Sequence, residues 1–231
     1  NPVAMMQLVE IVKGEKTSET ILNRARAFTT AISRLPLDVK SSPGFLVNRI
    51  LMPYLIEAME LAGEGVSLAT IDQAALKFGM PMGPIQLADT VGLDICLFVA
   101  QELSEPLGIT VPEALAKMVE DGKLGRKSGQ GFYHYDKKGH AQKPAARSTN
   151  VPVADRLVMR ILNEARACLR EGVVASVDAV DAGMVYGTGF APFRGGPMHY
   201  AEVLGNETVS HTLYRLSEEY GKRFQPDTGW S

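Results

Sequence analysis

The chain lacks several features that would assign it to a class of protein at once. It has only two cysteines in 231 residues and a net charge of −2. It also has no uninterrupted apolar run of about 18 residues, the length that spans a membrane. We therefore expect no disulfide framework, no membrane span and no nucleic-acid-binding surface. The hydrophobic content of 45% excludes a disordered chain and is enough for packed cores.

The two cysteines and the four histidines are all expected to be structural or exposed. Cys96 and Cys168 lie far apart in apolar, helix-like sequence, which is typical of reduced core thiols in a cytoplasmic protein. The histidines have no metal-ligand spacing, so we predict no metal site. The first residues, Asn1-Pro2-Val3, are neither an initiator methionine nor a signal peptide. We therefore expect the chain to be part of a longer protein.

Residues 1–40 have the pattern of a strand, a helix and a second strand. Residues 5–12 form a short apolar run, Thr17 or Ser18 can cap the helix that follows, and residues 36–39 are a second strand candidate. Such a unit is typical of the end of a parallel α/β domain. Because one unit cannot cover both faces of a sheet, we expect this segment either to dock on a neighbouring copy or to be less ordered.

The remainder is predicted to be helical and duplicated. Several residues of the first helical part of the chain recur in the same order, and at nearly constant spacing, in the second helical part. Arg49, Glu57 and Gly65 match Arg156, Glu164 and Gly172. Further along, Pro84 and Gly92 match Pro197 and Gly205. Ordered repeats of glycine, proline and charge indicate an internal duplication whose copies pack on each other. We predict a first helical domain over residues 41–139, a linker over 140–150 and a second repeat over 151–231.

Two polar residues stand out in otherwise apolar elements. Glu10 shares a strand face with Met6, Leu8 and Val12, and burying a carboxylate is costly unless it is paired. It is either an edge-strand residue that faces water or a carboxylate that orients a general base. Asn48 lies at the start of an apolar helix, where it is either a cap or a functional amide.

Several segments of the sequence resemble 3-hydroxyacyl-CoA dehydrogenases. These are Asn1-Pro2-Val3 with the strand around Glu10, Ser42-Pro43-Gly44-Phe45-Leu46-Val47-Asn48-Arg49, Gly79-Met80-Pro81 and Gly125-Arg126-Lys127-Ser128-Gly129-Gln130-Gly131-Phe132-Tyr133. The second repeat, through residues 185–187 and 189–196, is similar to the duplicated C-terminal unit of the family's multifunctional fatty-acid-oxidation members.

This resemblance implies a fold and an activity. The implied fold is mainly α: a duplicated helical domain of the 6-phosphogluconate dehydrogenase C-terminal type, preceded by a βαβ remnant of a Rossmann domain. The implied reaction is the NAD-dependent oxidation of a 3-hydroxyacyl-CoA to a 3-ketoacyl-CoA in fatty-acid β-oxidation. Expected partners are the acyl-CoA substrate, a second copy of the chain and a thiolase β subunit.

The resemblance also implies roles for individual residues. Glu10 matches the glutamate that pairs with the catalytic histidine, and Asn48 matches the asparagine that hydrogen-bonds the substrate. Asn1 matches a position near the nicotinamide, and Tyr186 a substrate-contacting tyrosine. The family's histidine lies three residues before the position of Asn1, and no glycine-rich NAD loop is present. We therefore expect these 231 residues alone to be inactive.

Two other functions are compatible with the sequence. One is a non-catalytic helical module for dimerisation or acyl-CoA binding. The other is a related dehydrogenase domain that acts on a smaller hydroxy acid. In the second repeat Asp155 stands at the position of Asn48, so we expect that copy to be structural.

Overall fold

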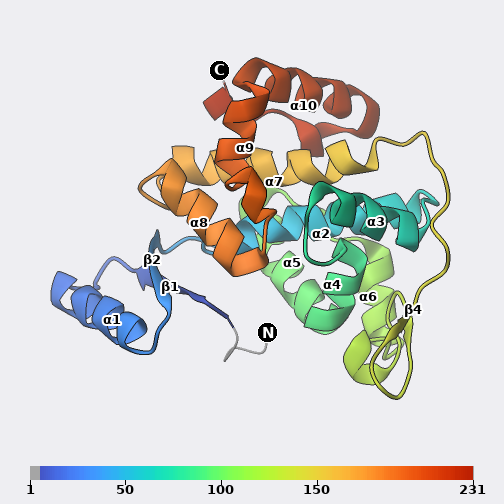
Figure 1. Cartoon of the computed structure of the whole chain (residues 1–231), viewed down its shortest axis with the longest axis horizontal. Coiled ribbons are helices and arrows are strands. Elements are labelled where there is room, and N and C mark those ends of the chain that lie inside the picture. Colours follow the sequence, from blue (N-terminus) through green and yellow to red (C-terminus); the bar gives the residue numbers. More distant parts are fainter. Residues whose placement is uncertain (1–5, 231) are drawn as a thin grey trace. The chain divides into compact units, whose positions relative to one another are not determined.

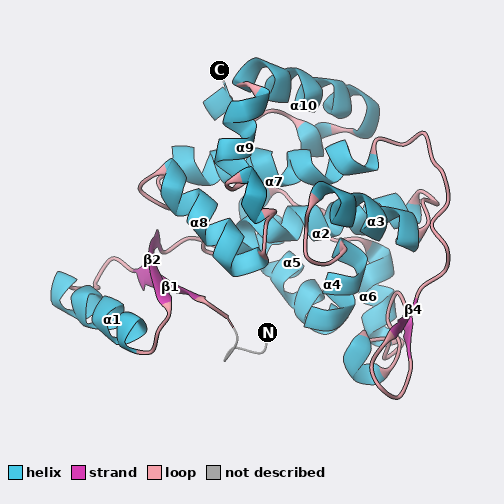
Figure 2. Ribbon diagram, in the orientation of Figure 1, coloured by secondary structure: helices cyan, strands magenta, loops and turns pink. Residues whose placement is uncertain are grey.

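The computed structural model describes residues 6–230, and it is mainly helical (Figures 1 and 2). The chain divides into two compact units. The first, the split unit, contains the residues up to Ile50 and those from Ile161 onward; the second, the central unit, runs from Leu51 to Arg160. The two units are defined by which residues pack together, and each contains parts of both sequence repeats. They therefore do not test the domain boundaries at residues 41, 140 and 151, which stay a prediction.

The elements of the chain follow in order. They are β1 (Leu8–Lys13), α1 (Glu19–Ala31), β2 (Leu35–Lys40), α2 (Val47–Gly63), α3 (Leu68–Phe78), α4 (Pro84–Val91), α5 (Leu93–Leu107), α6 (Glu113–Glu120), β3 (His134–Tyr135), β4 (Ala141–Gln142), α7 (Val153–Arg170), α8 (Val177–Thr188), α9 (Pro197–Leu204) and α10 (Asn206–Tyr220). Short 3-10 turns occupy Arg126–Ser128, Pro192–Arg194, Lys222–Phe224 and Thr228–Trp230.

The predicted strand–helix–strand is present at the start of the split unit. β1 and β2 pair in parallel, in register from Leu8 opposite Leu35 to Lys13 opposite Lys40. Ser18 caps α1, since its hydroxyl accepts a hydrogen bond from the backbone N–H of Ile21. The first strand begins at Leu8, which is later than the start of the apolar run in the sequence.

One face of this two-stranded sheet is covered by α8 of the same unit. A Cβ at Gly183 would lie 3.0 Å from the Leu37 side chain, and one at Gly187 would lie 3.1 Å from Leu8. The two glycines therefore let the strands approach α8 closely. Lys40 donates its backbone N–H to the carbonyl of Val173 at 2.8 Å. The split unit thus covers this face of the sheet with its own helix, and docking of the segment on a neighbouring copy stays a prediction.

The duplication is confirmed by helix lengths and caps. α4 and α9 have eight residues each, and α5 and α10 have 15 each. In the central unit the Asp72 carboxylate accepts the N–H of Ile85 at the start of α4 (2.9 Å). In the split unit Asp181 accepts the N–H of Met198 at the start of α9 (2.7 Å). Buried carboxylates thus satisfy the helix N-termini at equivalent positions of both repeats.

Two ion-pair clusters, each around a buried arginine, also follow the duplication. In the central unit, Arg156 binds Glu57 (Nη2 to Oε1, 2.6 Å) and Glu64. In the split unit, Arg49 binds Glu164 (2.7 Å) and Glu171 (2.7 Å). These side chains form three pairs of equivalent positions, with the same spacing along the chain between the members of each pair. Each repeat therefore supplies an arginine to the two glutamates of the other.

The glycine-rich segment around residues 125–135 has a structural role in the central unit. Asp89 accepts hydrogen bonds from the backbone N–H groups of Phe132 and Tyr133 and from the Tyr135 hydroxyl, all at 2.9 Å. A Cβ at Gly131 would lie 2.0 Å from the Asp89 carboxylate, so only glycine fits there. The glycine-rich segment is therefore needed to form a loop that surrounds the buried Asp89 carboxylate.

Candidate functional site

Glu10 is held at the start of α2 within the split unit. Its Oε1 accepts the backbone N–H of Leu46 at 2.8 Å and, at 3.4 Å, that of Val47. The side chain is half-buried. Burial raises the pKa of the Glu10 carboxyl, and the two hydrogen bonds from the helix start oppose that rise. Glu10 is therefore not a strand residue that simply faces water.

Asn48 lies in the first turn of α2, close along the chain to the N–H groups that bind Glu10. It is exposed, and its amide makes no hydrogen bond to any residue that the structure describes. The preceding turn carries Gly44 at φ 73° and Phe45 at φ 51°, a strained conformation for a non-glycine residue. Glu10, and not the Asn48 amide, therefore accepts the N–H groups of Leu46 and Val47 at this helix end.

Tyr186 lies elsewhere on the split unit. It is 48% exposed on α8, where the next residue, Gly187, lies against Val47 and Leu8. It lines a small pocket of about 350 Å³ with residues such as Gln7 and Leu35, at the amino ends of the two strands. No hydrogen bond joins Tyr186 to Glu10 or Asn48 among the described residues. Asn1 lies outside the described residues.

Sequence reasoning overlooked one residue beside this site. The Ser42 hydroxyl is buried without a hydrogen-bond partner among the described atoms, at the turn that leads into α2. Leaving a buried hydroxyl unpaired costs free energy and usually has a functional or solvent explanation. The 42–49 motif drew attention to the segment, but no pattern in it marked Ser42 as buried.

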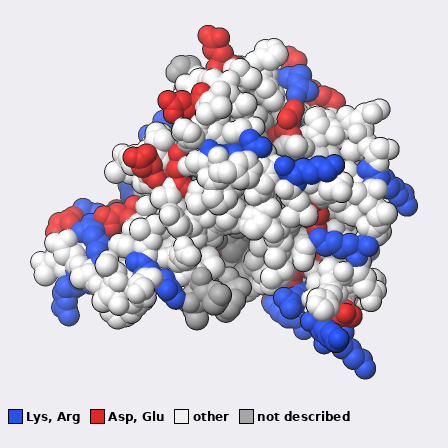
Figure 3. Space-filling model, viewed as in Figure 1, with Lys and Arg blue, Asp and Glu red and all other residues white. Residues whose placement is uncertain are grey.

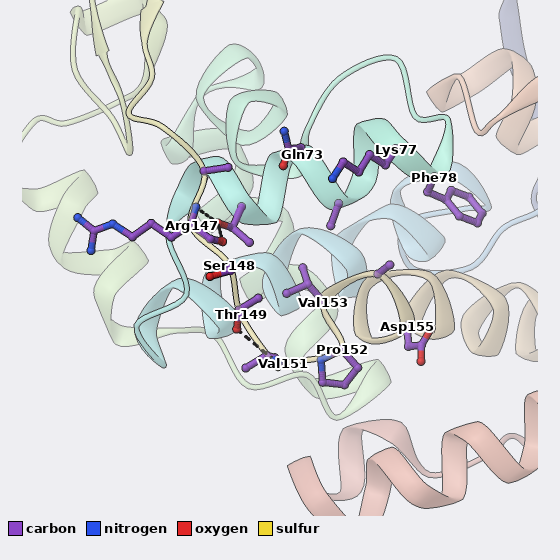
Figure 4. Close-up of a pocket in the computed structure, with 14 residues that line it drawn as sticks. Gln73, Lys77, Phe78, Arg147, Ser148, Thr149, Val151, Pro152, Val153 and Asp155 are labelled. Atoms are coloured by element: carbon purple, nitrogen blue, oxygen red, sulfur yellow. Dashed lines mark hydrogen bonds between the residues drawn. The ribbon is translucent and has the colours of Figure 1, made fainter.

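A separate pocket of about 650 Å³ lies in the central unit, between α3 and the segment leading into α7 (Figure 4). The Thr70 hydroxyl fastens this segment by bonding both the backbone N–H and the carbonyl of Arg147, at 2.9 and 2.8 Å. The Arg147 side chain points away from the groove. Asp155 lines the pocket, but Glu10, Asn48 and Tyr186 do not. We do not take it as the catalytic site.

The described residues offer neither a metal site nor a reactive cysteine. Over residues 6–230 no cluster of three His, Cys, Asp or Glu side chains could hold a metal ion. In the same range no helix is long and apolar enough to cross a membrane. Cys96 and Cys168 are free and buried, and burial raises the pKa of each thiol to about 12. Neither thiol is therefore poised as a nucleophile.

The raised pKa of Glu10 predicts a pH-dependent effect of its replacement. Because the folded-state pKa is above the unfolded value, ionising this carboxyl costs stability as the pH rises through the folded pKa. Glu10→Gln keeps an oxygen acceptor for Leu46 and Val47 but removes the charge. We expect urea unfolding to show equal or higher stability than wild type at pH 7, with the difference gone at pH 3. A large loss at pH 7 would contradict this reading.

Comparison with known proteins fits this arrangement. Residues 44–135 and 153–230 match the family model "3-hydroxyacyl-CoA dehydrogenase, C-terminal domain", and residues 1–42 match the NAD binding domain of the same family. The chain belongs to the 3-hydroxyacyl-CoA dehydrogenase family. This confirms the resemblance seen in the sequence, together with the duplicated, mainly helical fold after a βαβ remnant.

Relatives within the family extend the comparison. The fatty acid oxidation complex subunit alpha of Shewanella sp. (strain ANA-3) is 38% identical over 98% of this chain, and that of Shewanella baltica (strain OS185) is 39% identical over 98%. The chain spans about a third (34%) of the length of these proteins.

Solved structures show the same fold. 3-Hydroxybutyryl-CoA dehydrogenase from Escherichia coli K12 superposes with a TM-score of 0.81 over 100% of this chain and 68% of that chain, at 24% identity. (S)-3-Hydroxybutyryl-CoA dehydrogenase from Ralstonia eutropha has a TM-score of 0.56 and 41% identity over 59% of this chain and 50% of that chain. The first comparison concerns the fold alone.

Proposed function

We propose that this chain forms the substrate-side portion of an NAD-dependent 3-hydroxyacyl-CoA dehydrogenase of fatty-acid β-oxidation. The observation that carries the proposal is the turn at the start of α2. A half-buried carboxylate, Glu10, is fixed there by two backbone N–H groups beside the exposed amide of Asn48. A carboxylate with a raised pKa that is kept in place by the fold is a common mark of a functional site.

In the proposed mechanism each residue does one thing. Glu10 orients a neighbouring general base and stabilises its protonated form, as a buried carboxylate does for a catalytic imidazole. The resemblance places that histidine three residues before the position of Asn1. Asn48 donates a hydrogen bond to an oxygen of the substrate near the reacting carbon. Tyr186 and Asn1 are proposed to contact substrate and nicotinamide, respectively.

NAD, when bound, accepts the hydride, but the described residues do not form its site. The turn from β1 to α1 contains one glycine, Gly14, and so lacks the glycine-rich loop that lets a backbone approach the pyrophosphate. The match of residues 1–42 to the family's NAD-binding domain supports NAD as the cofactor of a longer polypeptide. We assign no step of this chain's residues to the cofactor.

Partners and location are part of the same proposal. The curated relatives are named as subunits of a fatty acid oxidation complex, which supports a second subunit, proposed to be a thiolase. We also propose pairing with a second copy of the chain. The two free, buried thiols support a cytoplasmic location.

The experiment compares the 231-residue chain with a polypeptide that extends upstream of Asn1. With 3-hydroxybutyryl-CoA and NAD, the longer polypeptide should produce NADH and the 231-residue chain should not. A general base alone contributes about 10²–10⁴-fold, and hydride transfer needs bound cofactor. Acyl chains of several lengths then give the substrate preference. Turnover by the 231-residue chain, or none by the longer one, would overturn the proposal.

A further inference from the structure

A second pocket of the split unit lies where β1 and β2 end. It has a volume of about 410 Å³ and is lined by residues of both strands, of α1 and of the connection from α7 to α8. Its floor is apolar and buried, with Ile11, Leu22 and Val173 each below 9% exposed. The backbone bond from Lys40 to Val173 holds the α7–α8 connection against the end of β2.

The rim of this pocket carries an unusual pair of like charges. Lys13 and Lys40 are register partners at the last position of the two strands, and both line the pocket. Like charges directly opposite each other in a sheet repel and cost stability. Because side chains alternate along a strand, Lys13 shares the face of Ile11, which is opposite to the face of Glu10. The pocket is therefore distinct from the candidate catalytic site.

The other charges around the rim compensate Lys13 but not Lys40. Lys13 binds Glu19 at 2.7 Å, and Arg26 binds Asp38 at 2.7 Å. Lys40 is exposed and has no ion pair within residues 6–230. Figure 3 shows basic and acidic side chains next to one another over the α1 region. The rim thus keeps one uncompensated positive charge above an apolar floor.

We propose that this pocket binds an aliphatic carboxylate. The anionic head lies between the Lys13 and Lys40 ammonium groups, and the hydrocarbon tail lies on Ile11, Leu22 and Val173. Glu19 already binds Lys13, so the anionic head supplies the counter-charge that Lys40 lacks. The carboxyl ends of parallel strands are a usual place for ligands, and the volume suits a small molecule.

Calorimetric titration of the intact chain with octanoate tests this site. Octanol supplies the tail without the charge, and inorganic phosphate supplies a charge without the tail. Octanoate should bind with one site per chain, and both controls at least about tenfold more weakly, because charge-assisted bonds and apolar burial both contribute. Lys13→Gln and Lys40→Gln should each weaken octanoate about tenfold. Lys16→Gln, an exposed lysine outside the pocket, should leave it unchanged.

A second variant keeps the test decisive. Ala175 is an exposed lining residue, so Ala175→Trp should fill the pocket mouth and abolish octanoate binding while the circular dichroism spectrum stays unchanged. Absence of octanoate binding would overturn the proposal. So would octanol binding as tightly as octanoate, phosphate binding as tightly as octanoate, or unchanged octanoate binding in Lys13→Gln, Lys40→Gln and Ala175→Trp.

Discussion

Replacing Arg156 by Met should lower the free energy of unfolding by about 3–5 kcal/mol, because it removes the arginine that binds the buried carboxylate of Glu57. Arg156 and Glu57 are both 0% exposed, and their side chains meet at 2.6 Å. Domains are stable by only about 5–15 kcal/mol, so the loss is a large part of the total. Urea unfolding followed by circular dichroism measures it.

The duplication supplies a matched control for this variant. Arg49 binds Glu164 and Glu171, whose side chains are 19% and 39% exposed. Water can therefore reach these carboxylates when the arginine is removed, and Arg49→Met should cost less than Arg156→Met. The double variant Arg156→Met/Glu57→Met should recover most of the loss, since it removes the orphaned charge. A cost below about 1 kcal/mol for Arg156→Met, the scale of an exposed pair, would contradict this account.

Replacing Asn48 by Ala in the longer enzyme should lower kcat far more than it lowers stability. A preorganised hydrogen bond to the reacting centre is worth about 2–4 kcal/mol of transition-state binding, or roughly 30- to 1,000-fold in rate. The Asn48 side chain is exposed and unbonded among the described residues, so little stability depends on it. Steady-state NADH formation and thermal unfolding of the same preparation separate the two effects.

Asp155 provides the control for Asn48. It stands at the equivalent position of the second repeat and lies in the first turn of α7. Asp155→Ala should leave turnover unchanged. If instead Asn48→Ala unfolds the protein while the activity of each folded molecule is intact, Asn48 is a helix cap. The bonds from Leu46 and Val47 to Glu10 argue against that role.

The sequence predicted well those features that depend on local pattern. The strand–helix–strand and the duplication, with its repeated glycines, follow from spacing and from the backbone preferences of single residues. Equivalent glycines end α3 and α8, at Gly79 and Gly189, both in the left-handed conformation. A repeated glycine of this kind can be recognised from the sequence alone, because it depends on the local backbone and not on contacts with distant segments.

Contacts between distant segments could not be predicted in this way. Matched Arg and Glu positions indicated two equivalent sets, but not that Arg156 would bind Glu57 of the other repeat. Glu10 bonds the start of a helix far along the chain from its own strand, and periodicity gave two readings of this residue. The hydrogen bonds from Leu46 and Val47, at the start of α2, show that the Glu10 carboxylate is fixed by the fold. The catalytic roles of Glu10, Asn48, Tyr186 and Asn1 remain predictions.

The pH dependence of kcat/KM for Glu10→Gln in the longer enzyme tests the central claim most directly, namely that this carboxylate orients and charges the general base. With Gln in place of Glu, the protonated base loses its neighbouring negative charge, so its pKa falls. The acid limb of the profile should then shift to lower pH, and the plateau should fall at least about tenfold because the base is no longer oriented. A profile with the wild-type limb and plateau would contradict the assignment of Glu10 to the active site.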